Sequence, residues 1–555
     1  MFSIYHYIKL QLKERLSTPV KSSILYLSPV LLLVIEWIIG QASSLEDEND
    51  RKISKKFIYD STVLLLLYIV LNYRIAYEII REKQIFRKQH VHTYGFGLLR
   101  FYIAWEIIYA ILIFISSVIV IAIVYIMGFL SHVNIIIAFL TFYLFQLADV
   151  SFFMFVSTFF SGLPTIGGIL SAFLQIASVV SYLLVIYFED YKKNHQKIGQ
   201  HGTLTSIASS YFEVRKAELN GETINFSNLM DRNHNNIFFD MITSISSVLC
   251  IILLALFVDF FLYSIHASRN FTDRSSRSHF IKLIENKYND TNPIHPENNN
   301  GVIRYLNELN VFPIDGIAIS IKHLFKKYSN KIMAISDVSF DINDNEIFVI
   351  TGPKNSGKST LMKMLYGRQP SSFGYVYYKE GDNMKEMGYG KWGSLTHNIS
   401  VAPKENYMFM ESLSVSDHIK FYQSMTSSHE DGFALLNELH FTGNTSDHVK
   451  DLSEVEKTKV KIALALLKFQ KYIFLEEPTA GMNEKDTLSF WNAIRARSTN
   501  RVIIVSTDNM EEAIHNGNRI LVLKGGMVDC IGDSEYVRNR TSSSNSSEHK
   551  IDIKN

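Results

Sequence analysis

Residues 352–359 read GPKNSGKS and match the pattern G-x-x-x-x-G-K-[ST] of a phosphate-binding loop. The apolar run IFVI at 347–350 precedes this loop, and the helix-like stretch LMKML at 361–365 follows it. In that strand–loop–helix order, backbone N–H groups and the positive end of the helix surround phosphate oxygens. A chance glycine-rich turn would need neither flanking element. The sequence therefore predicts an α/β P-loop domain that binds ATP or GTP.

The glycines and polar residues of the loop each have an expected task. Gly352 and Gly357 allow backbone N–H groups to approach phosphate oxygens closely. Lys358 would reach the β- and γ-phosphates, and the hydroxyl of Ser359 would ligate Mg²⁺. The loop residues expected to bind the nucleotide are Gly352, Pro353, Lys354, Asn355, Ser356, Gly357, Lys358, Ser359 and Thr360. Mg²⁺ is therefore the second expected cofactor.

The first half of the chain carries long runs of Ile, Leu, Val and Phe, and hydrophobic residues make up 47% of the whole sequence. A membrane-spanning helix needs about 20 mostly apolar residues. A core helix of a soluble protein could explain any one of the apolar runs, but not six together. We therefore expect a six-helix α transmembrane domain over 22–266. The expected spans are about 22–40, 57–74, 101–128, 134–160, 165–188 and 237–263.

The distribution of Lys and Arg predicts the orientation of these spans, because cytosolic flanks are enriched in both residues. Segments 1–21 and 74–100 are basic and fall on one side if the chain alternates. An even number of spans then returns the phosphate loop to the same, cytosolic, side. We expect a multi-pass membrane protein with a cytosolic N-terminal segment at 1–21. The sequon at Asn225, within 189–236, would lie outside.

Other segments and residues give weaker indications. Asp149 lies in the middle of an expected span, where a carboxylate is either a functional group or a structural one. Polar segment 267–316 is expected to be a linker, and Ser/Asn-rich 537–555 a disordered tail. The net charge of +1 implies no nucleic-acid partner, and two cysteines form no disulfide framework.

From Ile317 on, the chain resembles the nucleotide-binding domain of ATP-binding cassette (ABC) transporters, which implies ATP as the nucleotide. We expect this domain at 317–536, with a helical subdomain near 415–470. The motifs that carry the resemblance are Tyr328 at the position of the aromatic that stacks on adenine, 401–406 at the Gln loop, 451–456 at the signature motif, 472–479 at the Walker B strand, 481–483 at the D-loop and 507–510 at the switch region.

Several features are similar to the A subfamily in particular. The basic segment 77–83, continuing to Thr93-Tyr94-Gly95, looks like its first cytosolic loop, and the ending at 528–533 also matches. The order of membrane half before nucleotide half fits that subfamily as well. Its members usually carry two such halves and a large exterior domain after the first span. Here we find one half, and 41–56 is a short loop.

The catalytic motifs depart from the family pattern at three positions around the γ-phosphate. Lys404 replaces the Gln, Glu476 replaces the Asp on the Mg²⁺ side, and Asp508 replaces the switch His. A reacting group displaced by about 1 Å can cost on the order of a hundredfold in rate. The negative charge of Asp508 would repel the γ-phosphate. The resemblance keeps Glu477 as general base.

The signature motif and the D-loop also differ. Ser453, which the resemblance places on the ATP of a partner domain, is present. Glu454 and Val455 replace the two glycines that follow it, and Asn483 replaces the D-loop Asp. These substitutions fit relaxed selection on a redundant copy. They also fit a subunit that binds ATP while its partner hydrolyses it, and the sequence does not separate the two.

The leading hypothesis is an ABC-type half transporter that couples ATP to transmembrane movement of a lipid-like or amphipathic substrate, with slow hydrolysis. The alternative is a catalytically impaired subunit whose ATP binding gates or stabilises a partner half. An ion channel on the same scaffold is a weaker third reading. Because cassette domains bury two ATPs between a pair of domains, the resemblance implies a homodimer or heterodimer, with membrane lipids as further partners.

Overall fold

The computed structural model describes two compact units, the first reaching Phe261 and the second beginning at Leu262. The residues that it describes are 5, 7–9, 11–13, 69–84, 98–126, 133–160, 163–191, 223–227, 229, 235–272, 316–328, 332–381, 383–387, 398–426, 430–467 and 469–540.

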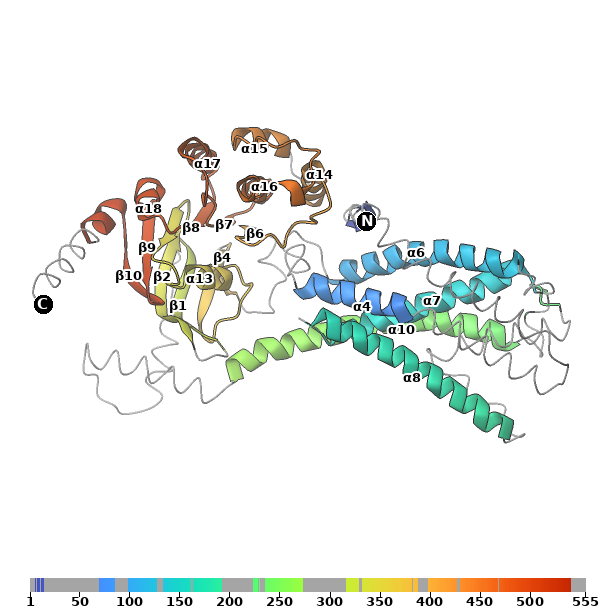
Figure 1. Cartoon of the computed structure of the whole chain (residues 1–555). Coiled ribbons are helices and arrows are strands. Elements are labelled where there is room, and N and C mark those ends of the chain that lie inside the picture. Colours follow the sequence, from blue (N-terminus) through green and yellow to red (C-terminus); the bar gives the residue numbers. More distant parts are fainter. Residues whose placement is uncertain are drawn as a thin grey trace, which may run out of the picture. The chain divides into compact units, whose positions relative to one another are not determined.

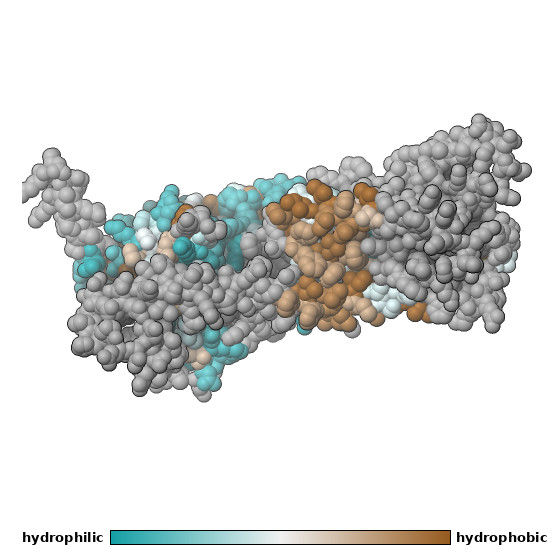
Figure 2. Space-filling view, turned by 90° about the horizontal axis from the view of Figure 1, so that it is seen from below, coloured by the Kyte–Doolittle hydropathy of each residue, from teal (hydrophilic) through white to brown (hydrophobic). Residues whose placement is uncertain are grey.

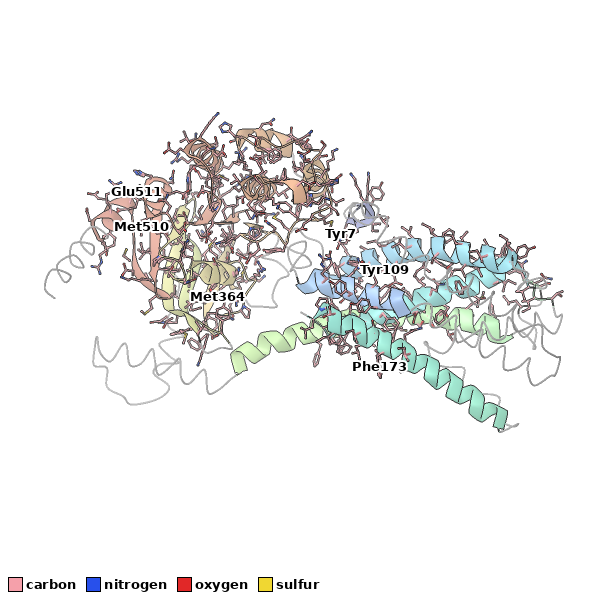
Figure 3. All side chains as sticks on the ribbon, in the orientation of Figure 1. Tyr7, Tyr109, Phe173, Met364, Met510 and Glu511 are labelled. Carbon is pink, nitrogen blue, oxygen red and sulfur yellow. The ribbon has the colours of Figure 1, made fainter. Side chains whose placement is uncertain are left out.

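The first unit is helical (Figure 1). Its helices are α4 (Ile69–Gln84), α6 (Leu98–Ile126), α7 (Ile135–Thr158), α8 (Pro164–Tyr191) and α10 (Asn235–Thr272), the last of which continues past Phe261. Helix α4 packs against α7 and α8, and α6 packs against α7. Tyr109 on α6 is buried, whereas Phe173 on α8 is exposed (Figure 3). Figure 2 shows apolar residues gathered in one band on the face that it draws. Exposed apolar side chains on helices are what a lipid-facing surface requires.

Within the described residues, three helical segments are long and apolar enough to cross a membrane. They are Leu99–Ile123, Ile135–Thr158 and Met241–Asp259, and Pro164–Ala177 is a shorter apolar segment. The expected span at 22–40 lies outside the described residues. Of the expected span at 57–74, the structure describes 69–74, which begin α4; this helix continues beyond the expected span to Gln84. An i,i+4 ion pair between Arg74 and Glu78 supports this continuation.

A buried polar contact joins three of these helices. Asn72 on α4 donates from Nδ2 to Oδ2 of Asp149 on α7 at 2.7 Å, and Ser171 Oγ on α8 donates to the main-chain oxygen of Asn72 at 3.3 Å. Asp149 is 4% exposed. Its Oδ2 therefore helps to join the helices, while its Oδ1 is buried without a hydrogen-bond partner among the described residues, and the functional reading of Asp149 stays a prediction.

The second unit is an α/β domain with two sheets (Figure 1). The four-stranded sheet is antiparallel in the order β2-β1-β4-β5, with β1 (Ile317–Lys327), β2 (Met333–Asn343), β4 (Phe373–Glu380) and β5 (Asn383–Glu386). The six-stranded sheet has the order β10-β9-β3-β8-β7-β6, with β3 (Ile347–Thr351), β6 (Ile399–Ala402), β7 (Tyr472–Glu476), β8 (Val502–Ser506), β9 (Arg519–Lys524) and β10 (Met527–Gly532).

The helices of this unit are α13 (Lys358–Leu365), α14 (Val415–Thr426), α15 (Gly432–Glu438), α16 (Glu454–Leu466), α17 (Glu484–Ala496) and α18 (Met510–Asn516), with a 3₁₀ turn at Val449–Asp451. Strands β3, β7 and β8 are buried along their whole length, which is typical of parallel strands covered on both faces. The α/β P-loop class predicted from the sequence is confirmed for this unit.

The parallel strands place the candidate site. Strands β6, β7, β8, β3 and β9 run in the same direction, so their carboxyl ends meet at one edge of the sheet. The phosphate loop follows β3, Lys404 follows β6, Glu477 follows β7 and Asp508 follows β8. Ligands of open parallel sheets bind outside this edge. The topology therefore gathers four segments that are far apart in the sequence.

Candidate nucleotide-binding site

The phosphate loop is built around two glycines that no other residue can replace without strain. Gly352 has φ +146°, and a Cβ on it would lie 2.1 Å from the main-chain oxygen of Leu523. Gly357 has φ +102°, and its Cβ would lie 2.7 Å from Ala334 O. Gly357 also forms the N-terminal cap of α13. Neighbouring backbone thus fixes the path of the loop into the helix, as the sequence pattern predicts.

Two polar groups of the loop fit a bound phosphate. The ammonium of Lys358 donates to the main-chain oxygens of Gly352 at 2.7 Å and Pro353 at 3.0 Å, so it lies inside the curve of the loop. Burial lowers the pKa of Lys358. The hydroxyl of Ser356 is buried and has no hydrogen-bond partner among the described residues. A phosphate oxygen would satisfy this hydroxyl, and the lysine could turn to the same anion.

Tyr328, just after β1, contacts the start of α13. Its hydroxyl lies 3.2 Å from Thr360 Oγ1 and donates to Gln369 Oε1 at 3.1 Å. Lys326 Nζ lies 5.5 Å from the centre of its ring, within the range of a cation–π contact. The structure therefore brings the expected adenine-stacking residue to the helix that follows the phosphate loop.

Glu476 ends β7 as a buried carboxylate with a proton donor on each oxygen. Tyr366 OH donates to Oε1 at 2.8 Å, and the backbone N–H of Lys404 donates to Oε2 at 3.4 Å. Burial raises the pKa of Glu476. A metal ion at this carboxylate would compete with donors that the protein already supplies. The extra methylene relative to Asp is thus used to reach Tyr366.

Glu477, the expected general base, forms an ion pair with Lys404. The distance between Lys404 Nζ and Glu477 Oε2 is 2.6 Å, and the lysine side chain is 57% exposed. The hydrogen bond to Glu477 raises the pKa of the Lys404 ammonium. Glu477 has φ +45°, and its N–H donates to Ser506 O at 2.9 Å, which anchors its backbone at the end of β8. Lys404, which stands where the family has a Gln, therefore pairs with the carboxylate of the expected general base, Glu477.

Asp508 is exposed and lines a cavity of about 250 Å³ beside the base. Glu477, Gly481 and Thr507 lie on the same cavity. The hydroxyl of Thr507 donates to Glu512 Oε2 at 2.8 Å, which holds the switch segment against α18. Two carboxylates therefore face a space where the family pattern has one carboxylate and one histidine.

The signature segment forms the N-terminus of α16. Ser453 is its N-cap and accepts a hydrogen bond from Glu456 N at 3.2 Å. Glu454 is exposed, and it accepts hydrogen bonds from Lys457 Nζ at 2.8 Å and Asn406 Nδ2 at 3.0 Å. These hydrogen bonds lower the pKa of Glu454. Val455 lies beside Gly481, where an added Cβ would be 3.4 Å from Val455 Cγ2. The described contacts of 453–455 do not include the phosphate loop of the same chain.

The model of the ABC transporter family matches residues 335–480. The mouse protein "Cholesterol transporter ABCA5" is 27% identical over 503 residues, which cover 86% of this chain and 30% of the relative. The rat protein "Phospholipid-transporting ATPase ABCA3" is 28% identical over 230 residues, which cover 40% of this chain and 13% of the relative. Residues 335–480 are thus an ABC transporter domain, and the chain is similar to A-subfamily transporters over 86% of its length. It thus spans less than a third of the length of these relatives.

Among solved structures, an ATP-binding subunit of an ABC transporter is 19% identical with a TM-score of 0.36. It matches 40% of this chain over 93% of its own length. The roles assigned above to individual site residues stay predictions.

Three residues of the site were missed by the sequence reasoning. Tyr366 donates to Glu476, Asn406 donates to Glu454, and Lys461 donates from Nζ to Lys404 O at 2.8 Å. Lys461 gave one usable signal, because a lysine within the otherwise apolar run 460–467 of an ABC signature helix is unexpected. The other two have no local sequence signal, because their partners lie 48 and 110 residues away.

Proposed function

We propose that this chain binds ATP with Mg²⁺ at the 352–360 loop, hydrolyses it slowly, and couples it to movement of a lipid-like or amphipathic substrate across a membrane. The observation that carries the proposal is the Lys404–Glu477 ion pair beside an intact phosphate loop. Binding depends on the loop, while hydrolysis depends on the base. The phosphate loop has the residues that nucleotide binding needs, whereas the base Glu477 is restrained by its ion pair with Lys404.

The binding step uses groups that the chain retains. Lys358, Ser356 and the loop N–H groups would bind the phosphates, and the ring of Tyr328 would stack on the adenine. Ser359 would hold Mg²⁺, and Glu476 would reach the ion only by giving up its hydrogen bond from Tyr366 or from Lys404 N–H. The bound metal ion would neutralise phosphate charge. Hydrogen bonds between charged groups are about twice as strong as neutral ones, so Lys358 should contribute most to affinity.

The hydrolytic step requires Glu477 to accept a proton from water, and Lys404 opposes this step. Its ammonium occupies one of the two carboxylate oxygens, since Nζ and Oε2 are 2.6 Å apart. An ion pair with an exposed lysine contributes about 1 kcal/mol, which corresponds to roughly a fivefold change in rate.

Asp508 adds a second restraint, because it places a negative charge where the γ-phosphate gains charge in the transition state. A repulsion between unit charges at about 4 Å is roughly 1 kcal/mol in water and roughly 4 kcal/mol at an effective dielectric constant near 20. A donor in that position would lower the barrier instead. Slow hydrolysis, rather than none, is therefore the expected state.

The membrane part of the proposal is a domain of six spans with the N-terminus and the ATPase domain in the cytosol. The apolar helices α6, α7 and α10 and the A-subfamily relationship support it. The names of the mouse and rat relatives, a cholesterol transporter and a phospholipid-transporting ATPase, favour a lipid-like substrate. Two P-loop domains are needed to close the ATP sites, so we infer a dimer with a second copy or a related half.

The alternative is a subunit in which ATP binding gates a partner and turnover has no role. Glu454 and Val455 favour it, because a carboxylate at the N-terminus of α16 would repel the γ-phosphate of a partner's ATP. The distinguishing experiment uses the purified full-length protein in lipid nanodiscs. ATP binding and ATPase rate are measured for the parent, Lys358→Ala and Glu477→Gln. Slow turnover lost in Glu477→Gln with binding retained supports the proposal, and identical background rates support the alternative. ATP binding unaffected by Lys358→Ala would contradict both.

A further inference from the structure

Lys461 is a buried lysine whose ammonium holds the main chain of the Gln-loop segment. It lies on α16, is 3% exposed, and has buried neighbours on both sides in Val460 and Ile462. Its Nζ donates to Lys404 O at 2.8 Å. Burying an ammonium costs free energy, so a buried lysine is retained only where its contacts compensate for that cost. The compensating contact here is made with the residue that pairs with the base.

Lys404 uses its main chain and side chain for separate contacts. Its N–H donates to Glu476 Oε2 at 3.4 Å, its carbonyl oxygen accepts from Lys461, and its ammonium pairs with Glu477. Because the backbone groups are held on both sides, the direction of the Cα–Cβ bond is fixed. This fixed direction allows a flexible and exposed side chain to keep its ammonium beside Glu477.

The same helix holds the Gln-loop segment at two further points. Ser400 Oγ on β6 donates to Ala465 O of α16 at 2.7 Å. Asn406 Nδ2 donates to Glu454 Oε2 at the start of α16. The contacts of Ser400, Lys404 and Asn406 follow α16 from its C-terminal to its N-terminal end. A displacement of α16 would therefore move the whole segment 400–406.

We propose that Lys461 is a positioning residue that keeps Lys404 paired with Glu477, so that a displacement of the signature helix α16 frees the base. This inference rests on the proposed function, in which Lys404 restrains hydrolysis. The new element is that the position of α16, the helix whose N-terminus carries the signature segment, determines whether Lys404 stays paired with Glu477. The side chain of Lys461 itself has no contact with Glu477 among the described interactions; it acts through the main chain of Lys404.

Zero-length crosslinking of the full-length protein tests the inference without any need for activity. A carbodiimide joins an ammonium to a carboxylate only when the two are in contact, and mass spectrometry locates the Lys404–Glu477 bond. We expect the crosslinked fraction to fall several-fold in Lys461→Met and to persist in Lys461→Arg, which keeps a donor. Lys420→Met, at an exposed lysine on α14, is the matched control and should resemble the parent.

ATPase kinetics give the second readout. Lys461→Met should raise kcat in the same direction as Lys404→Gln with an unchanged Kd for ATP, and the double variant should be no faster than Lys404→Gln alone, since both act on one contact. A purely structural lysine would instead lower kcat and stability. If Lys461→Met loses ATP binding, Lys461→Gln is used as the test variant instead. The glutamine side chain is polar, but it is too short to reach the main-chain oxygen of Lys404.

The outcomes separate the inference from the function on which it rests. An unchanged crosslink and an unchanged rate in Lys461→Met, with a faster Lys404→Gln, would overturn the role of Lys461 and leave the proposed function standing. A Lys404→Gln variant no faster than the parent would overturn the restraint itself, whatever the crosslink shows.

Discussion

Lys404 and Glu477 are 73 residues apart in the sequence, yet the ammonium of the first lies 2.6 Å from a carboxylate oxygen of the second. They meet because β6 and β7 are parallel neighbours, so the residues after each strand emerge side by side. In the family pattern, the first position is a Gln and carries no charge. In this chain, the charged ammonium of Lys404 therefore restrains the base Glu477 electrostatically, which an uncharged Gln would not do.

The first prediction concerns this pair. Lys404→Gln should raise the ATPase rate about two- to tenfold, because it removes an ion pair of about 1 kcal/mol and frees Oε2 of the base. The affinity for ATP should not change, since the phosphate loop is untouched. Steady-state ATPase assays and nucleotide titration of the same preparation measure both. Lys420→Met controls for the loss of a positive charge, and a lower rate in Lys404→Gln would contradict the restraint.

Asp508→His is the second prediction. The substitution replaces a negative charge near the γ-phosphate with a donor, so turnover should rise by at least about fivefold, which corresponds to the 1 kcal/mol expected in water. Asp508→Asn serves as the control, because it removes the charge without supplying an imidazole. Its rate should fall between the parent and the histidine variant. Equal rates in all three proteins would show that Asp508 lies too far from the reacting phosphate.

The third prediction is a pH dependence of stability caused by Lys461. Burial lowers the pKa of Lys461 from 10.5 to about 8. Between these values the unfolded chain binds more protons at this lysine than the folded chain, so stability increases as the pH rises through that window. Below about pH 8 both states are protonated, and the full cost of burying the charge remains. The charged groups around Lys461 are Glu454, Glu405, Glu476 and Lys457.

Lys461→Met isolates this contribution. Relative to the variant, the parent should gain of the order of 1–3 kcal/mol of unfolding free energy between about pH 8 and 10.5. Denaturant unfolding of both proteins at each pH gives the difference, and Lys420→Met, which removes an exposed lysine, should show no such trend. A difference that is constant over this pH range would mean that Lys461 keeps its ordinary pKa.

The fourth prediction is that Asn225 faces the non-cytosolic side. The proposed six spans place 189–236 outside, and Asn225-Phe226-Ser227 is a sequon that enzymes on that side can modify. An impermeant thiol reagent should label Asn225→Cys in intact cells, and Cys250→Ser removes the exposed native cysteine as background. Labelling that requires permeabilised cells would change the number of spans.

The sequence was sufficient for features that are local. The phosphate loop was predicted because two glycines, a lysine and a serine occupy fixed spacings between a strand and a helix. The structure adds the reason for the glycines: a Cβ at either position would lie within 3 Å of a main-chain oxygen, that of Leu523 on β9 or that of Ala334 on β2. The α/β class followed from the same segment and the ABC resemblance from the order of the motifs. The A-subfamily resemblance followed from segments 77–83 and 528–533 and from the order of the two halves.

The sequence was insufficient for features that depend on tertiary contacts. Substitution of Gln by Lys404 predicted a change at the catalytic site, but not an ion pair with Glu477, because the pairing arises from strand order. Glu476 was expected to be displaced by its extra methylene, and the structure shows that this length reaches Tyr366. The second span was expected at 57–74, and the sequence did not indicate that the helix itself continues to Gln84, with Arg74 and Glu78 paired inside it.

The most direct test of the central claim is the ATPase rate of the purified full-length homodimer, measured together with its affinity for ATP. Both sites of a homodimer carry Lys404, Glu476, Asp508, Glu454 and Val455. We predict saturable ATP binding that Lys358→Ala abolishes, and turnover at least about a hundredfold below the enzyme median of about 10 s⁻¹. A homodimer that hydrolyses ATP at about 10 s⁻¹ would contradict the account, because every restraining substitution would then be without effect.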